Sequence, residues 1–216
     1  MQIPFTVEQF LGVFREYNLG VWPTQGFLLG MALLAIFAAF RQRPRSDIVV
    51  SLILALLWVW IAVAYHLVYF TRINPAAYAF AALSMAGAGV FVWQGVIRRR
   101  LAFAWSGGPR GLAGLALIGF ALVIYPLWSI YVGHSYPEMP TFGLPCPTTI
   151  FTVGVLCFAK FPMPRSPVVA PVLWCLVGTQ AAFQFGVWPD LGLLIAGVVG
   201  LTLFFTARPF HQEALA

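Results

Sequence analysis

The chain has 216 residues, of which 61% are hydrophobic and only 8% are charged, and its formal net charge is +6. Its mean hydropathy is +0.89, and a water-soluble domain of this size needs more polar residues to cover its surface. The apolar runs are continuous and about 20 residues long, which fits bilayer-spanning helices and excludes the short alternating strands of a membrane barrel. We therefore predict an all-α, polytopic membrane protein.

The chain opens with an amphipathic stretch. Five apolar side chains recur at helical spacing within residues 5–18, while Glu8, Arg15 and Glu16 fall largely on the opposite side. This pattern predicts a short helix lying on the membrane surface, and residues 1–20 form an external amphipathic segment. The first ten residues lack a basic region and a small-residue cleavage motif, so we expect no cleaved signal peptide.

Seven apolar runs follow and predict one seven-span membrane domain over residues 1–216. The expected spans are about 21–40, 48–70, 75–97, 112–132, 147–161, 168–185 and 189–207. Pro126 predicts a kink in the fourth span. The fifth run has only about fifteen residues, too few to cross a bilayer as a helix. It therefore begins below the surface or draws the preceding loop into the membrane.

The basic residues indicate an orientation. Ten of the twelve lie in 41–47, 98–110, 160–166 and the tail, whereas the other side of the membrane holds only Arg15 and Arg72. The positive-inside rule places the C-terminus in the cytoplasm and the N-terminus outside. We expect a multi-pass protein of the cell membrane, and we expect that membrane to be the inner membrane of a bacterium. No basic patch interleaved with surface aromatics predicts nucleic-acid binding.

The acids fall mainly on the outer side. Glu8, Glu16, Glu138 and Asp190 all belong there by the same topology, and none is expected inside a span. The chain therefore offers no membrane-embedded acid for proton coupling.

An external, proline-rich loop at 133–147 concentrates the unusual chemistry. Its four prolines predict a rigid path rather than a helix. Pro147 suits the first position of the next helix, which places Cys146 beside the N-cap and Thr148 and Thr149 in the first turn. A helix N-terminus favours anions and lowers the pKa of a thiol, so this segment is a candidate site. Capping of the helix by the two threonines is the alternative.

Polar side chains of the outer half complete the candidate site. The expected ligand-binding residues are His66, Asn74, His134, Glu138, Cys146, Thr148, Thr149, Gln180 and Gln184. Three of them, His66, His134 and Cys146, are expected within roughly 10 Å of one another as ligands of a soft divalent metal. The alternatives are a structural hydrogen bond for His66, solvated loop positions for His134 and Glu138, and interhelical hydrogen bonds for the glutamines.

The stretch Asn18-Leu19-Gly20-Val21-Trp22-Pro23-Thr24-Gln25 resembles the N-x-x-V/L-W-P-x-Q opening of an uncharacterised family of small bacterial multi-span proteins. The PCPTTIF run at 145–151 extends the resemblance over most of the chain. Some members of that family are labelled permeases, but the resemblance implies no established activity and no catalytic residue.

Three functions remain open at this point. A polytopic chain with a broken helix and outer polar residues favours binding or transport of a small solute or ion through an outward-facing polar pocket, with a homo-oligomer able to complete the pathway. A metal-dependent membrane hydrolase is the first alternative, although no H-E-x-x-H, G-x-S-x-G or phosphate-binding loop occurs. The second is a non-catalytic subunit or sensor. We lean against an enzyme.

Overall fold

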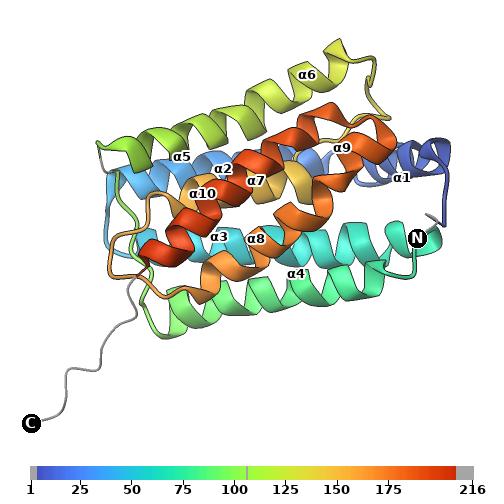
Figure 1. The fold of residues 1–216 in the computed structure, drawn as a ribbon. Coiled ribbons are helices and arrows are strands. Elements are labelled where there is room, and N and C mark those ends of the chain that lie inside the picture. Colours follow the sequence, from blue (N-terminus) through green and yellow to red (C-terminus); the bar gives the residue numbers. More distant parts are fainter. Residues whose placement is uncertain (1–3, 106, 208–216) are drawn as a thin grey trace, which may run out of the picture.

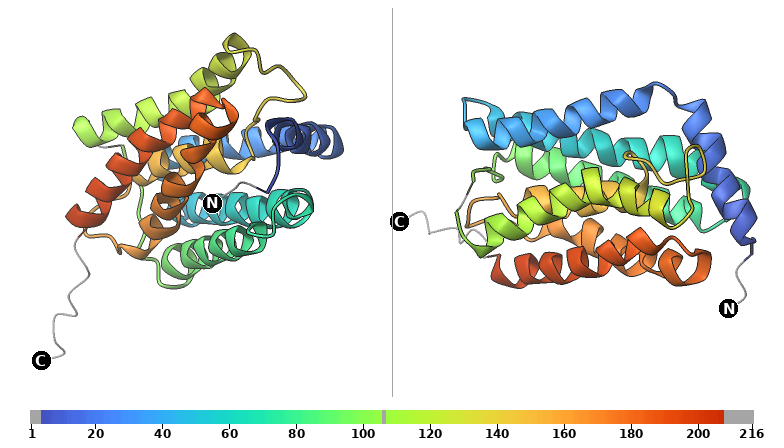
Figure 2. Two further views of the ribbon diagram at one scale, coloured as in Figure 1. Left: turned by 45° about the vertical axis from the view of Figure 1, so that its right-hand side comes forward. Right: turned by 90° about the horizontal axis from the view of Figure 1, so that it is seen from above.

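The computed structural model describes residues 4–105 and 107–207. Long helices lie side by side along one direction, and a shorter helix, α1 (Val7–Gly20), runs across one end of them (Figures 1 and 2). We call this end the α1 end. The opposite end carries the loops rich in arginine and is called the basic end.

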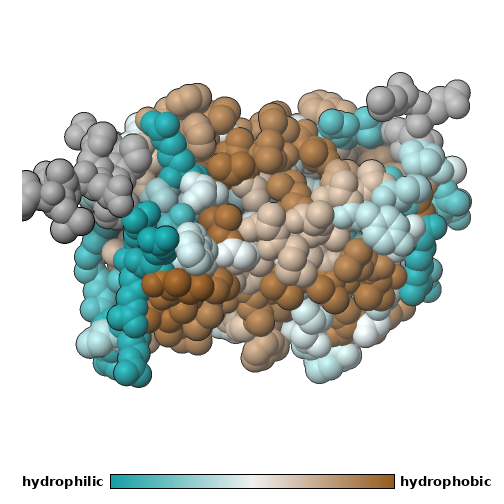
Figure 3. Space-filling model, turned by 90° about the horizontal axis from the view of Figure 1, so that it is seen from below, coloured by the Kyte–Doolittle hydropathy of each residue, from teal (hydrophilic) through white to brown (hydrophobic). Residues whose placement is uncertain are grey.

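Within the described ranges, six helical stretches are long and apolar enough to cross a membrane. They are α2 (Thr24–Arg41); α3 (Ser46–Trp60) continued by η1 (Ile61–Leu67) and η2 (Phe70–Arg72); α4 (Ala77–Phe91) with η3 (Val92–Ile97); α5 (Pro109–Gly119), η4 (Phe120–Ile124) and α6 (Tyr125–Tyr131); α8 (Ser166–Gly178) with α9 (Gln180–Phe185); and η5 (Trp188–Leu191) with α10 (Gly192–Thr206). Figure 3 shows a hydrophobic belt between two hydrophilic ends. The prediction of an all-helical, multi-pass membrane protein is confirmed.

The predicted kink at Pro126 coincides with a change of helix type. The chain winds as a π-helix over η4 before α6 begins at Tyr125. Proline lacks the amide hydrogen that an α-helix needs, and the wider turn is a common way to accommodate that loss. The same stretch therefore stays continuous across the bundle.

The fifth predicted span is α7 (Pro145–Leu156), a helix of only 12 residues. At 1.5 Å per residue it is about 18 Å long, against about 30 Å of hydrocarbon. Every residue of α7 except Cys146 is buried, so the helix lies in the centre of the bundle. Gly114 of α5 and Gly154 of α7 let the two backbones touch, because a Cβ built on either glycine would come within 3 Å of the other's carbonyl oxygen.

Extended chain completes the path on both sides of α7. At the α1 end, Leu144 is fully buried and Phe142 packs its ring against Phe151, so the preceding loop is drawn into the bundle as expected. At the basic end, the Ala104 amide donates to Phe158 and the Lys160 amide donates to the carbonyl of Ala102. These bonds satisfy backbone groups that lipid could not.

Helix α1 packs on the bundle as well as facing outward. A capping box between Thr6 and Gln9 starts the helix. Its apolar side chains Phe10, Phe14 and Tyr17 are buried against protein, so the face that was expected to contact the membrane mostly contacts the bundle.

The side chain of Asn18 holds the proline-rich loop to α1. Its amide donates to the carbonyls of Pro137 at 2.6 Å and Met139 at 2.8 Å. Its oxygen accepts hydrogen bonds from Gln25 and from Thr141. Asn18 is fully buried; its bond to Met139 is buried and the other three are part-buried. The first and last residues of the N-x-x-V-W-P-x-Q stretch therefore serve one structural network.

We predict that Asn18→Ala destabilises the protein by about 2–3 kcal/mol, because it removes the donor to two carbonyls and the acceptor shared by Gln25 and Thr141 in a largely buried network. The measurement is the free energy of unfolding in mixed micelles. Gln9→Ala, an exposed change on the same helix, serves as the control and should cost less than about 1 kcal/mol. Equal losses for the two variants would contradict the role assigned to Asn18.

Candidate functional site

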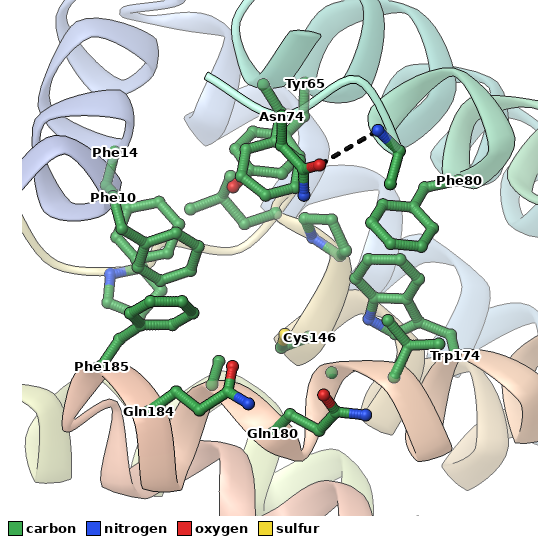
Figure 4. A pocket seen from close by; sticks show the side chains of 18 of the residues that line it. Phe10, Phe14, Tyr65, Asn74, Phe80, Cys146, Trp174, Gln180, Gln184 and Phe185 are labelled. Atoms are coloured by element: carbon green, nitrogen blue, oxygen red, sulfur yellow. Dashed lines mark hydrogen bonds between the residues drawn. The ribbon is translucent and has the colours of Figure 1, made fainter. Parts of the chain in front are cut away.

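A cavity of about 370 Å³ lies at the α1 end, bounded by α1, η1, the start of α4, the start of α7, and α8 with α9. We call it the outer-end pocket. Figure 4 shows Phe10, Phe14 and Phe185 on one side and Phe80 with Trp174 facing them. The Phe10 and Phe185 rings stack with centroids 4.3 Å apart, and the Phe80 and Trp174 rings meet edge to face at 5.3 Å. The walls are therefore mainly aromatic, whereas the sequence had indicated a polar pocket.

Polar side chains stand at the rim of the outer-end pocket. Gln180 and Gln184 of α9 are exposed and point into the cavity from one side (Figure 4). Asn74 also lines it, with its side-chain oxygen accepting the Ala76 amide at 3.0 Å. These three amides are neutral donors and acceptors. Among the described residues that line the pocket, none carries a charged side chain.

The inner end of the pocket is formed by Cys146. As predicted, this residue sits at the start of a helix, although α7 begins at Pro145 and not at Pro147. Its thiol hydrogen-bonds the carboxyl group of Asp190, which also accepts a hydrogen bond from the Tyr125 hydroxyl. Asp190 is 1% exposed. It lies in the candidate span Trp188–Thr206 and is buried inside the bundle, so the expectation that no acid lies inside a span is wrong.

Sequence reasoning missed this cluster, although one signal was available. Asp190 follows Trp188-Pro189 directly and precedes an uninterrupted apolar run, so it lies in the first turn of a span. A carboxyl group at such a position rarely faces lipid and normally finds a partner inside the bundle.

His66 is fully buried, and neither of its ring nitrogens has a hydrogen-bond partner among the described residues. Its ring lies against Trp174, with centroids 5.1 Å apart, and against Phe80. Both neighbours line the outer-end pocket, but His66 itself does not. The structural hydrogen bond considered for His66 is therefore not present there.

The loop residues His134 and Glu138 lie elsewhere. The His134 ring is 3.2 Å from the carbonyl oxygen of Gly186, and Glu138 forms an exposed ion pair with Arg15 at 3.1 Å. In the part of the chain that the structure describes, no three His, Cys, Asp or Glu side chains are grouped so that they could hold a metal ion. The predicted metal set of His66, His134 and Cys146 is therefore not assembled.

The two threonines of α7 differ in their partners. The Thr148 hydroxyl accepts the Gly143 amide at 3.2 Å, which ties the loop to the first turn as a cap would. The buried Thr149 hydroxyl has no partner within the described chain. Neither residue lines the outer-end pocket.

Electrostatics beside the pocket favour neutral groups. Burial raises the pKa of Tyr17, whose neutral hydroxyl accepts the Trp60 indole N–H at 2.7 Å. Outside the pocket, Arg15 pairs with Glu138 and Arg72 pairs with Glu16, so the two arginines of the α1 end are both balanced by acids.

Comparison with known proteins gives one match. The model of a family of unknown function (DUF6064) matches residues 7–214, nearly the whole chain. No curated protein and no solved structure matches the chain significantly. The matched range includes the N-x-x-V-W-P-x-Q stretch and the PCPTTIF run, and the expectation of an uncharacterised family is confirmed. The chain belongs to this family of unknown function.

Proposed function

We propose that this membrane protein binds a small, uncharged and largely apolar ligand in the outer-end pocket. The observation that carries the proposal is the pocket itself: about 370 Å³ with aromatic walls, a few neutral amides at the rim, and no charged side chain among its described lining residues. Ligand sites in proteins are typically cavities of about 300–1,000 Å³ with apolar walls and few, well-placed polar groups.

The lining argues against a charged ligand. An anion or a metal ion in an apolar pocket loses its hydration and needs an opposite charge or several ligand atoms in return. The carboxyl group of Asp190, which does not line the cavity, is already bonded to the lining residues Cys146 and Tyr125. A neutral molecule avoids that cost and gains from burying its apolar surface among the rings.

We extend the proposal to the topology. Counting α7 with its extended flanks as one crossing gives seven crossings, with the α1 end outside and the basic end in the cytoplasm. Support comes from the nine described basic residues of the basic end, which are Arg41, Arg43, Arg45, Arg98, Arg99, Arg100, Arg110, Lys160 and Arg165. The cell membrane, in a bacterium the inner membrane, is the proposed location.

Reporter fusions at Ala216 test this topology. Green fluorescent protein attached there should be bright and alkaline phosphatase inactive, because the positive-inside rule keeps the basic end in the cytoplasm. Fusions after Thr71, on the opposite side, are the control and should show the reverse. A bright phosphatase signal from the Ala216 fusion would reverse the orientation of the outer-end pocket.

Transport of the ligand would require more than the pocket itself. Below Cys146, the residues from Thr148 to Leu156 are all buried, so α7 fills the path from the pocket toward the basic end. A ligand could pass only if α7 moved. Helices interrupted within the membrane are the elements that move or bind in many transporters. Binding is therefore the core of the proposal, and permease activity would require displacement of α7.

Cys146 reports on occupancy of the pocket, because Cys157 and Cys175 are buried and do not line it. In isolated membranes, N-ethylmaleimide should modify Cys146, and added naphthalene should slow that reaction severalfold. Ala181→Phe, which places a ring in the pocket, should slow it without naphthalene. Ala86→Phe, the same change at an exposed position of α4, should not.

Mass spectrometry of the modified peptides gives the rates. Cys146→Ala should abolish the labelling. If saturating naphthalene and Ala181→Phe both left the rate unchanged, the pocket would not be a ligand site.

A further inference from the structure

The basic end carries much more positive charge than its own acids can balance. Its nine described basic residues face one described acid, Asp47, which leaves a formal excess of eight positive charges. Asp47 is engaged by the backbone, since its carboxyl oxygen accepts the Phe103 amide at 2.7 Å. At the α1 end, by contrast, Arg15 and Arg72 are both paired with acids. An excess of one charge on a surface favours a partner of the opposite charge.

Four arginines of the basic end lie on aromatic rings. With the distance from the guanidinium carbon to the ring centroid, the pairs are Arg41 on Phe37 (5.1 Å), Arg98 on Trp93 (4.8 Å), Arg110 on Phe161 (4.3 Å) and Arg165 on Phe204 (5.4 Å). Phe37 and Trp93 lie in candidate spans and are exposed, so they face lipid in a membrane. These pairs hold positive charge at the edge of the hydrophobic belt, which the hydrophilic surface of the basic end borders directly (Figure 3).

Three of these arginines have their hydrogen-bond donors available. Arg165 donates through Nε to the carbonyl of Ala207 at 3.2 Å. The side chains of Arg41, Arg98 and Arg110, in contrast, have no acceptor and no acid among the described residues. A guanidinium group presents five N–H donors in a planar fork that matches the oxygens of a phosphate group. We call Arg41, Arg98 and Arg110 the arginine set.

We propose that the basic end binds acidic phospholipids, with their phosphate groups at the arginine set and their acyl chains along the hydrophobic belt. Clusters of basic residues beside a membrane-spanning helix attract acidic lipids in this way. The inference goes beyond the proposed function, because it concerns the opposite end of the bundle and does not depend on the outer-end pocket. It holds for either orientation of the chain in the membrane.

An acidic phospholipid fits this surface better than other phosphate compounds do. A zwitterionic lipid also carries a phosphate, but its amine group meets the same excess of positive charge. A soluble phosphate ester or a nucleic acid has no acyl chains to place against the exposed rings of Phe37 and Trp93. An acidic phospholipid brings both a net negative charge and apolar chains, so it contacts the arginines and the rings together.

Competition between two lipids that differ only in their headgroup tests the inference. The purified full chain, delipidated in dodecyl maltoside, is titrated with equimolar dioleoyl phosphatidylglycerol and dioleoyl phosphatidylcholine. Native mass spectrometry measures how much of each lipid is bound. Because each basic residue near a lipid surface strengthens the binding of acidic lipid roughly fivefold, the wild-type protein should prefer phosphatidylglycerol by roughly tenfold or more.

Substitutions in the arginine set should remove this preference. Arg98→Gln should weaken binding of phosphatidylglycerol roughly fivefold, and the triple variant R41Q/R98Q/R110Q should bind the two lipids nearly equally. Arg98→Lys keeps the charge but loses the planar fork, so its loss should be smaller than that of Arg98→Gln. If the triple variant fails to fold, the two single variants carry the test.

Arg72→Gln is the matched control. Arg72 also lies on an aromatic ring, that of Tyr69 at 5.2 Å, but it belongs to the α1 end and is paired with Glu16. This variant should keep the preference of the wild-type protein for phosphatidylglycerol.

Three results would overturn the inference. The first is a wild-type protein that binds both lipids equally. The second is an equal change, or none, in Arg98→Gln and Arg72→Gln. The third is displacement of phosphatidylglycerol by excess glycerol 1-phosphate or by a short single-stranded RNA at physiological salt, which would assign the arginine set to a soluble phosphate compound or to a nucleic acid. None of these results bears on the outer-end pocket, so the proposed function is tested separately.

Discussion

One constraint underlies this structure: the central crossing is made by a helix too short for a bilayer. Twelve residues of α7 cover little more than half of the hydrocarbon thickness, so the remaining path must be made by extended chain. Backbone amides in lipid cannot remain unpaired, and extended chain is therefore tolerated only when protein surrounds it. The six longer helical stretches of the described chain supply that enclosure, and the buried position of α7 follows from it.

The same constraint creates the pocket. Because α7 starts at Pro145, below the ends of its neighbours, the space above Cys146 is bounded by α1, α4 and α9 rather than filled by helix. The proline-rich loop that leads into α7 is held aside by Asn18, whose hydrogen bonds reach Pro137, Met139 and Thr141. A motif that resembles a family signature thus has a plain structural task, namely to keep the loop in place beside the cavity.

Much of the fold could be predicted from the sequence, because hydropathy and span length depend only on residues that are neighbours in the chain. The short fifth run even indicated the inward course of its loop, which buried Leu144 now shows. The site was harder to predict. Four expected residues line the cavity: Asn74, Cys146, Gln180 and Gln184. His134 instead contacts the carbonyl oxygen of Gly186, and Glu138 pairs with Arg15. Contacts between residues so far apart in the sequence leave no local sequence pattern.

The hydrogen bonds of Asp190 also constrain the order in which the bundle can be completed. Its two partners, Tyr125 of α6 and Cys146 of α7, precede it in the chain and are synthesised earlier. The span that begins at Trp188 therefore brings its carboxyl group into a membrane where both donors are already present, and that group does not remain unpaired in lipid until a later segment is made. Docking of α10 then closes the bundle around α7. The segment that carries Asp190 is thus synthesised after both of the groups that donate hydrogen bonds to its carboxyl group.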